Sequence, residues 1–174
     1  LPSSLLPVLP RADPPLHLHY CRYDPEHQHS KEGHRLTKKV NAALTKSQQA
    51  MQSQQFAEAL KHLNNLVKAD PQHGVFVVAA WMDLGTAHKE LGQYVEAMQH
   101  INMVLQRDAN NWSAHELQGL IHLEKEEFQE AVNTLQKAAE LSEGNQGVQQ
   151  NLHKAEVALK QSKQKDYFKI LGVA

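Results

Sequence analysis

The 174-residue sequence lacks the features of several large protein classes. It has one cysteine, Cys21, so it can form no internal disulfide and holds no Cys-x-x-Cys zinc or redox motif. Lys and Arg total 18 against 19 Asp and Glu, which is not the basic excess of a general nucleic-acid binder. No apolar run reaches the ~18 residues of a membrane span. We therefore expect neither nucleic-acid binding nor membrane insertion.

Motifs for catalysis are also missing. The sequence contains no HExxH, no glycine-rich phosphate loop, no GxSxG and no kinase signature. Its carboxylates are scattered over what we expect to be helix surfaces. We therefore predict no enzymatic activity, no cofactor and no resident metal, and we look for a binding role.

Proline is confined almost entirely to one end of the chain. Six of the seven prolines lie within residues 1–25, and Pro71 is the only one between Ser30 and Lys165. Proline interrupts helices and sheet ladders, so residues 1–29 are predicted to be an irregular arm. Ala, Leu, Gln, Glu and Lys dominate the rest, no strand-like alternation is present, and an all-α fold is expected.

An internal repeat of 34 residues organises the helical part. The pairs 34 residues apart are Gly85 with Gly119, His88 with His122, Tyr94 with Phe128 and Ala97 with Ala131. An earlier copy holds Phe56, Ala59 and Pro71, and it is offset by 38 residues from the next. A repeat of this length is one supersecondary unit that cannot bury its apolar stripe alone, so stacking of the units is required.

The spacing of the matched residues predicts two helices in each repeat. Trp81, Leu84 and Gly85 share one face of a helix, and Gly85 leaves room for a neighbouring helix to approach. Gly92 is expected to end this helix. Ala97 and Ala131 then allow tight packing by the second helix. After the third copy, Val148, Leu152, Ala155 and Leu159 give an amphipathic helix that covers the end of the stack.

The segment WMDLGTAHKELGQYVEA resembles a tetratricopeptide repeat (TPR), with His88 in place of the usual aromatic. The resemblance implies a solenoid of three helix pairs at 40–73, 78–111 and 112–145, within residues 30–145, and a closing helix at 146–165. The first copy departs most, because Lys46 and Ser47 stand where Leu and Gly are usual. The repeat signature comprises Phe56, Ala59, Pro71, Trp81, Leu84, Gly85, Tyr94, Ala97, Gly119, Phe128 and Ala131.

The last residues, 166–174, resemble the opening of a J domain. The matching residues are Asp166, Tyr167, Phe168, Ile170, Leu171 and Gly172, and the printed sequence stops before a His-Pro-Asp loop. Repeats, a closing helix and this opening are the order found in TPR–J-domain co-chaperones of the DnaJ subfamily C, most of all in an endoplasmic-reticulum member. The resemblance implies unfolded client proteins and a lumenal Hsp70 as partners, and the endoplasmic-reticulum lumen as the compartment. A cytosolic TPR adaptor is the competing interpretation.

The resemblance also predicts a peptide groove lined by the first helix of each repeat. Its candidate residues are Leu44, Gln48, Met51, Ala79, Met82, Asp83, Thr86, Leu117 and Leu120. TPR adaptors that grip the C-terminal carboxylates of Hsp70 and Hsp90 need Lys, Asn and Arg at positions held here by Leu44, Gln48, Asp83, Ser113 and Leu117. A carboxylate clamp is therefore not expected. Two roles remain open: a groove for apolar client segments, and a spacer between upstream repeats and the J domain.

The sequence has 12 histidines, and two groups of them are candidates for a specific role. His17, His19, Cys21, His27 and His29 alternate as metal ligands in an extended segment would, but no second cysteine completes a zinc set, so a solvated loop is favoured. His88 and His122 occupy matching repeat positions, which favours a packing role in the core.

Overall fold

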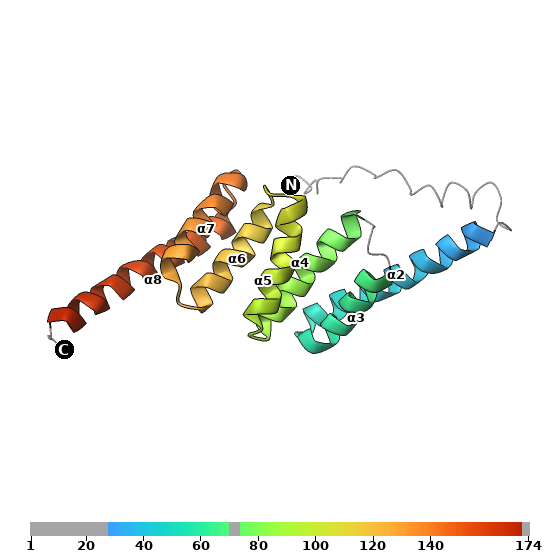
Figure 1. The fold of residues 1–174 in the computed structure, drawn as a ribbon, viewed down its shortest axis with the longest axis horizontal. Coiled ribbons are helices and arrows are strands. Elements are labelled where there is room, and N and C mark those ends of the chain that lie inside the picture. The colour runs from blue at the N-terminus through green and yellow to red at the C-terminus, as the bar shows by residue number, and fades with distance from the viewer. Residues whose placement is uncertain (1–27, 70–73, 172–174) are drawn as a thin grey trace, which may run out of the picture. The chain divides into compact units, whose positions relative to one another are not determined.

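The computed structural model describes residues 28–69 and 74–171, and the secondary structure within these ranges is helical throughout (Figure 1). This confirms the all-α prediction. The chain divides into two compact units, residues 1–42 and 43–174, with the boundary inside helix α2 (Gln28–Gln52). The predicted arm up to residue 27, Pro71 and Gly172 lie outside the described residues.

The helices of unit 43–174 come in pairs, as the repeat predicts. The end of α2 is followed by α3 (Phe56–Ala69), α4 (Gly74–Glu90) by α5 (Tyr94–Arg107), and α6 (Trp112–Glu124) by α7 (Phe128–Leu141). We call the first helix of a pair helix A and the second helix B. From α3 onwards each helix packs on the next, and the A helices α4 and α6 also touch. This arrangement is a TPR solenoid.

The closing helix is longer than the sequence pattern predicted. Helix α8 (Gln146–Leu171) begins at the expected residue, where the Asn145 side chain accepts hydrogen bonds from the backbone of Gly147 and Val148. It continues through Leu171, beyond the boundary expected at residue 165. The first residues of the predicted J-domain start therefore continue the closing helix.

Each turn between helices A and B contains one residue with a left-handed backbone, at the same repeat position. These residues are Gln54 (φ 58°), Gly92 (φ 72°) and Glu126 (φ 61°). The expectation that Gly92 ends helix A is thus confirmed. Glycine adopts this conformation without a steric cost, whereas Gln54 and Glu126 must accept one.

Small residues mark the places where helices approach most closely. A Cβ added to Gly119 would lie 2.6 Å from Cγ of Leu135, and one added to Gly85 would lie 3.3 Å from Ile101 and from Leu117. In the first repeat this position holds Ser47, which is fully buried. Its hydroxyl donates to the carbonyl of Leu44 at 2.8 Å, which satisfies the buried polar group.

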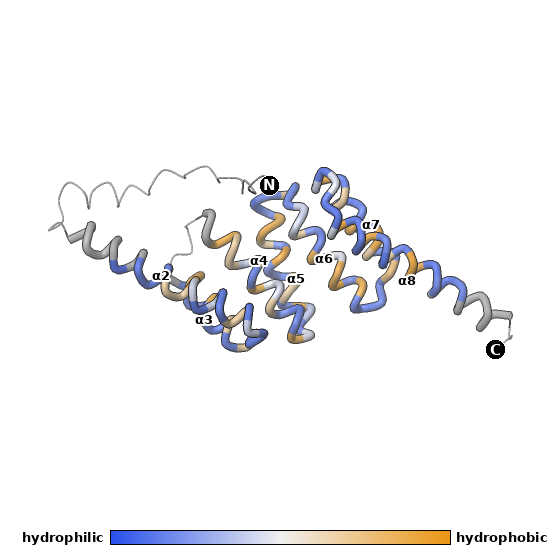
Figure 2. Tube along the Cα trace, turned by 180° about the vertical axis from the view of Figure 1, so that it is seen from behind, coloured by the Kyte–Doolittle hydropathy of each residue, from blue (hydrophilic) through white to orange (hydrophobic). Residues whose placement is uncertain are grey.

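The core runs from one repeat into the next. Ala97, Ile101 and Val104 of α5 form one cluster with residues of α6, and Ala131 and Leu135 of α7 form another with Ala155 of α8. The predicted tight packing of the second helices at Ala97 and Ala131 is therefore confirmed. Hydrophobic stretches lie along α4 to α7 (Figure 2).

Two features complete the description of unit 43–174. The guanidinium of Arg107, at the end of α5, lies 5.0 Å from the ring centre of Trp81 on α4, a cation–π contact that joins the two helices. None of the described helices combines the length and the apolar character needed to cross a membrane.

Candidate protein-interaction face

Helices α4 and α6 present the residues from which the sequence predicted a peptide groove. Ala79 is exposed, and Met82, Asp83, Thr86 and Leu120 are half-buried. We call these five residues the A-helix face. Leu44 and Met51 of α2 are half-buried and Gln48 is exposed, so these candidates too are accessible in the first repeat.

One predicted groove residue belongs to the core instead. Leu117 is only 7% exposed and lies in the cluster of α5 and α6 residues. Its Cδ2 occupies the space that the missing side chain of Gly85 leaves, 3.3 Å from where a Cβ would stand. The assignment of Leu117 to a groove was therefore wrong.

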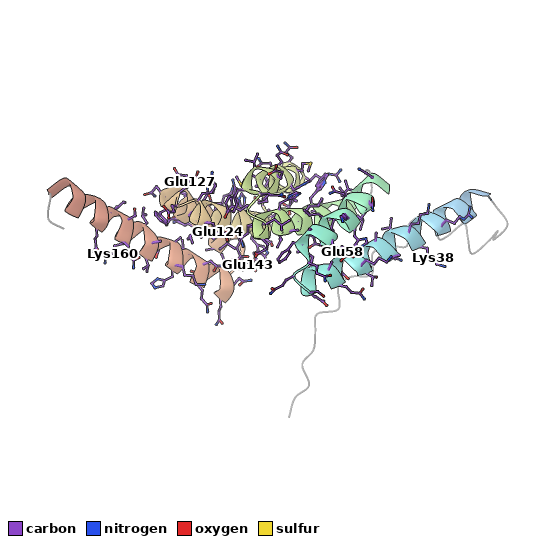
Figure 3. The ribbon with its side chains drawn as sticks, turned by 90° about the horizontal axis from the view of Figure 1, so that it is seen from below. Lys38, Glu58, Glu124, Glu127, Glu143 and Lys160 are labelled. Carbon is purple, nitrogen blue, oxygen red and sulfur yellow. The ribbon has the colours of Figure 1, made fainter. Side chains whose placement is uncertain are left out.

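An ion pair ties the two A helices together at one end of this face. Nζ of Lys89 lies 3.1 Å from Oε1 of Glu124 on α6 and 2.7 Å from Oε1 of Glu90 on its own helix. Burial alone would lower the pKa of Lys89, but the hydrogen bonds and charges of the two carboxylates outweigh it and raise that pKa. The hydroxyl of Tyr94 also bonds to Glu124, which raises the tyrosine pKa. Figure 3 labels the side chain of Glu124.

Asp83 is the unusual group on the A-helix face. Burial raises the pKa of its carboxyl, and no described side chain bonds to it or forms an ion pair with it. An aspartate that keeps its charge in a half-buried position attracts a cation more strongly than one in open water, because the local dielectric is lower. The face therefore combines apolar surface with one carboxyl group that has no described partner.

The closing helix continues the row of A helices. The side-chain amide of Asn151 on α8 donates to Oε1 of Glu116 on α6 at 2.9 Å. Asn151 lies 34 residues after Leu117, which lies 34 after Asp83, so the same repeat position recurs three times. Sequence reasoning treated α8 only as a cover and missed this contact. Extending the 34-residue period into α8 would have identified it.

The positions of a carboxylate clamp hold no cation. Leu44, Gln48, Asp83, Ser113 and Leu117 occupy them. Lys89 is the lysine closest to the A-helix face along α4, and it is already held by Glu90 and Glu124. An acidic C-terminus would meet the carboxylate of Asp83 where the clamp has an asparagine, and no lysine or arginine at the other positions.

His88 and His122 close the turns of their repeats. Nδ1 of His88 donates to Oε1 of Gln93 at 2.7 Å, and Nδ1 of His122 donates to Oε2 of Glu127 at 2.6 Å. Hydrogen bonds from Lys125 and then from His122 hold the pKa of Glu127 below its usual value. Both rings are half-buried, so the role differs from the core packing that their matching positions suggested.

Other sequence candidates stand as follows. Within the described ranges, no three His, Cys, Asp or Glu side chains converge as a metal site requires. His17, His19, Cys21 and His27 lie outside those ranges. The backbone of 166–171 is part of α8, but the side chains of the J-domain match lie outside the described ones.

Comparison with known proteins agrees with the helix-pair geometry. Two tetratricopeptide repeat models match residues 50–121 and 113–145. The crystal structure of the P58(IPK) TPR domain superposes with a TM-score of 0.74 at 22% identity, covering 84% of this chain and 41% of that one. Residues 50–145 therefore consist of tetratricopeptide repeats, and the protein is a TPR protein.

The curated relatives define the group more narrowly. Human DnaJ homolog subfamily C member 3 is 26% identical over 152 residues, which are 87% of this chain and 30% of the relative. The DnaJ protein P58IPK homolog of Arabidopsis thaliana is 31% identical over 160 residues, 88% of this chain and 32% of the relative. The chain resembles the TPR–J-domain co-chaperones of DnaJ subfamily C and spans about a third of the length of these relatives.

Proposed function

We propose that this chain is the TPR scaffold of a co-chaperone, which holds segments of unfolded client proteins on its A-helix face. The observation that carries the proposal is the composition of that face. Met82 and Leu120 offer apolar contacts, and methionine adapts its shape to varied partners. Asp83 adds a half-buried negative charge that has no described partner. Apolar segments with a neighbouring lysine or arginine fit this combination.

The scaffold also serves as a spacer in this proposal. The long α8 joins the third repeat directly to the residues that resemble a J-domain start. A continuous helix fixes distance and direction better than a flexible linker does. In a longer protein arranged like the relatives, helix α8 would fix the position of the J domain relative to the repeats. The partner of that J domain in this proposal is a lumenal Hsp70 of the BiP type, and the compartment is the endoplasmic-reticulum lumen. No enzymatic step is part of this role.

A cytosolic adaptor that grips acidic Hsp70 or Hsp90 tails is the second candidate. The names of the relatives fit a chaperone partnership in either compartment. The absence of cations from the clamp positions disfavours the adaptor, because Asp83 would repel a terminal carboxylate. The two candidates therefore predict opposite peptide preferences.

Peptide binding tests this choice. We expect an apolar peptide with two lysines to bind more tightly than its scrambled or glutamate-substituted versions, and acidic Hsp70 or Hsp90 C-terminal peptides to bind no better than scrambled controls. Fluorescence anisotropy at low and high salt measures each affinity. Asp83→Asn should weaken binding of the lysine peptide about two- to fivefold, as expected for one partly screened charge pair.

The matched control for this experiment is Glu96→Gln, which removes one carboxylate from the exposed side of α5. It should leave every affinity unchanged. Micromolar, salt-sensitive binding of the acidic peptides would overturn the proposal in favour of the clamp. Equal binding of all peptides would overturn the role assigned to Asp83.

A further inference from the structure

The second repeat contains a pair of stacked histidines between its two helices. The ring of His88 on α4 and the ring of His100 on α5 lie 5.3 Å apart between centroids, with an angle of 16° between their planes. Nδ1 of His88 donates to Gln93, so the first ring is fixed in place by a hydrogen bond to the turn. Two positively charged rings at this distance repel each other.

His100 is the more constrained of the two rings. Its Nδ1 is buried and has no hydrogen-bond partner among the described residues. A neutral imidazole can leave this nitrogen as an unprotonated acceptor, because the proton then sits on Nε2. A protonated ring must place an N–H there with nothing to receive it, which is costly in a buried site. Burial, and then the charge of His88, lower the pKa of His100.

The neighbouring repeats do not share this arrangement. In the third repeat, the residue 34 positions after His100 is Thr134, and the partner of His122 is the carboxylate of Glu127 rather than an amide. In the first repeat, His62 stands at the position of His100, but Ala50 replaces the opposing ring. Protonation therefore costs energy in the second repeat, whereas in the third it strengthens the bond between His122 and Glu127.

Among the described side chains of the surrounding helices, no carboxylate offsets this cost. On α3, Glu58, Lys61 and His62 line a surface cavity with Leu91, the residue after α4, and Glu58 is paired with His62. On α5, Glu96 lies one turn before His100. On α6, Glu124 is held by Lys89 and Tyr94. None of these bonds to Nδ1 of His100, and among the described residues the charge that shifts its pKa is that of His88, which lowers it.

We infer that the helix pair α4–α5 is an acid-sensitive element of the solenoid, which loosens when its stacked histidines are protonated while the pair α6–α7 stays closed. A histidine whose pKa is lowered on folding stabilises the fold above its ordinary value of 6.5, and this stabilisation is lost as the pH falls below that value. Helix α4 carries Met82 and Asp83, so loosening of this pair changes the A-helix face. The inference itself does not depend on the proposed function.

Hydrogen exchange of the full chain tests it. After correction for intrinsic exchange rates, we expect amides of α5 to lose at least about threefold more protection than those of α7 between pH 7.5 and pH 5.5. His100→Thr places the residue of the third repeat at this position and should abolish the difference. Gln93→Glu gives His88 a carboxylate partner like that of His122, and should reduce the difference in protection loss between α5 and α7.

An NMR titration of the histidine rings in the unmodified chain gives a second readout, which holds even where a variant is less stable. One ring, absent from the spectrum of His100→Thr, should titrate below the other histidines. Equal loss of protection in α5 and α7 would overturn the inference. So would a His100 ring that titrates with the exposed histidines, or an undiminished pH effect in His100→Thr.

Discussion

Replacing Gly119 with alanine should destabilise the protein by about 1–2 kcal/mol, even though alanine favours a helix over glycine by about 1 kcal/mol. The new Cβ would lie 2.6 Å from Cγ of Leu135, closer than two carbons can approach. Leu135 is fully buried, and Cγ is the branch point of its side chain, so the leucine cannot move aside without disturbing the core. Urea unfolding followed by circular dichroism measures the change.

Gly85→Ala is the matched control, since Gly85 and Gly119 occupy the same repeat position. Its Cβ would meet Cγ1 of Ile101 and Cδ2 of Leu117 at 3.3 Å, distances that small side-chain shifts relieve. The gain in helix propensity then offsets the crowding, and we expect a change of less than about 0.5 kcal/mol. Equal effects at the two glycines, or a stabilised Gly119→Ala, would contradict the packing described for α6 and α7.

Leu135→Ala should cost about 2–5 kcal/mol, because it opens a cavity where α7 meets both α6 and α8. In the Gly119→Ala background the same substitution should cost less, since the added methyl group then enters space that Leu135 has left. We expect a favourable coupling of about 0.5–3 kcal/mol between the two sites. A double-mutant cycle by urea unfolding measures this coupling.

The control for the cycle pairs Gly119→Ala with Leu63→Ala. Leu63 is also fully buried, but it lies on α3 in another repeat. Changes at separated sites add to within about 0.5 kcal/mol, so no coupling is expected. Coupling of the same size in both cycles would mean that Gly119 acts on the stability of the whole stack rather than on Leu135.

The repeat period made most of the fold predictable from sequence. Gly85, Gly119, Ala97 and Ala131 recur at 34-residue intervals because each repeat must bury the same surface against the next, and all four are buried. The number and order of the helices followed from this alone. The extent of α8 did not, because residues 166–171 lie past the last apolar position used for the prediction, Leu159, and no proline or glycine stops the helix before Gly172.

The candidate face was less predictable, because the exposure of each side chain depends on the size and chemistry of its neighbours. A repeat position states where a residue lies on its helix, but not whether a neighbour is large or small. Leu117 became core because Gly85 left it space, whereas Asp83, at the same repeat position, stayed half-buried. The histidines show the same limit. Positions 88 and 122 match, but their partners Gln93 and Glu127 give them different chemistry.

Binding of an unfolded protein to the A-helix face is the central claim. Hydrogen exchange of the chain, with and without a permanently unfolded protein such as a reduced and alkylated lactalbumin, tests it most directly. We expect added protection in α4 and α6, over Gly74–Glu90 and Trp112–Glu124, and unchanged exchange in α5 and α7. Protection confined to the B helices α5 and α7, or no change in any helix at saturating client, would contradict the claim.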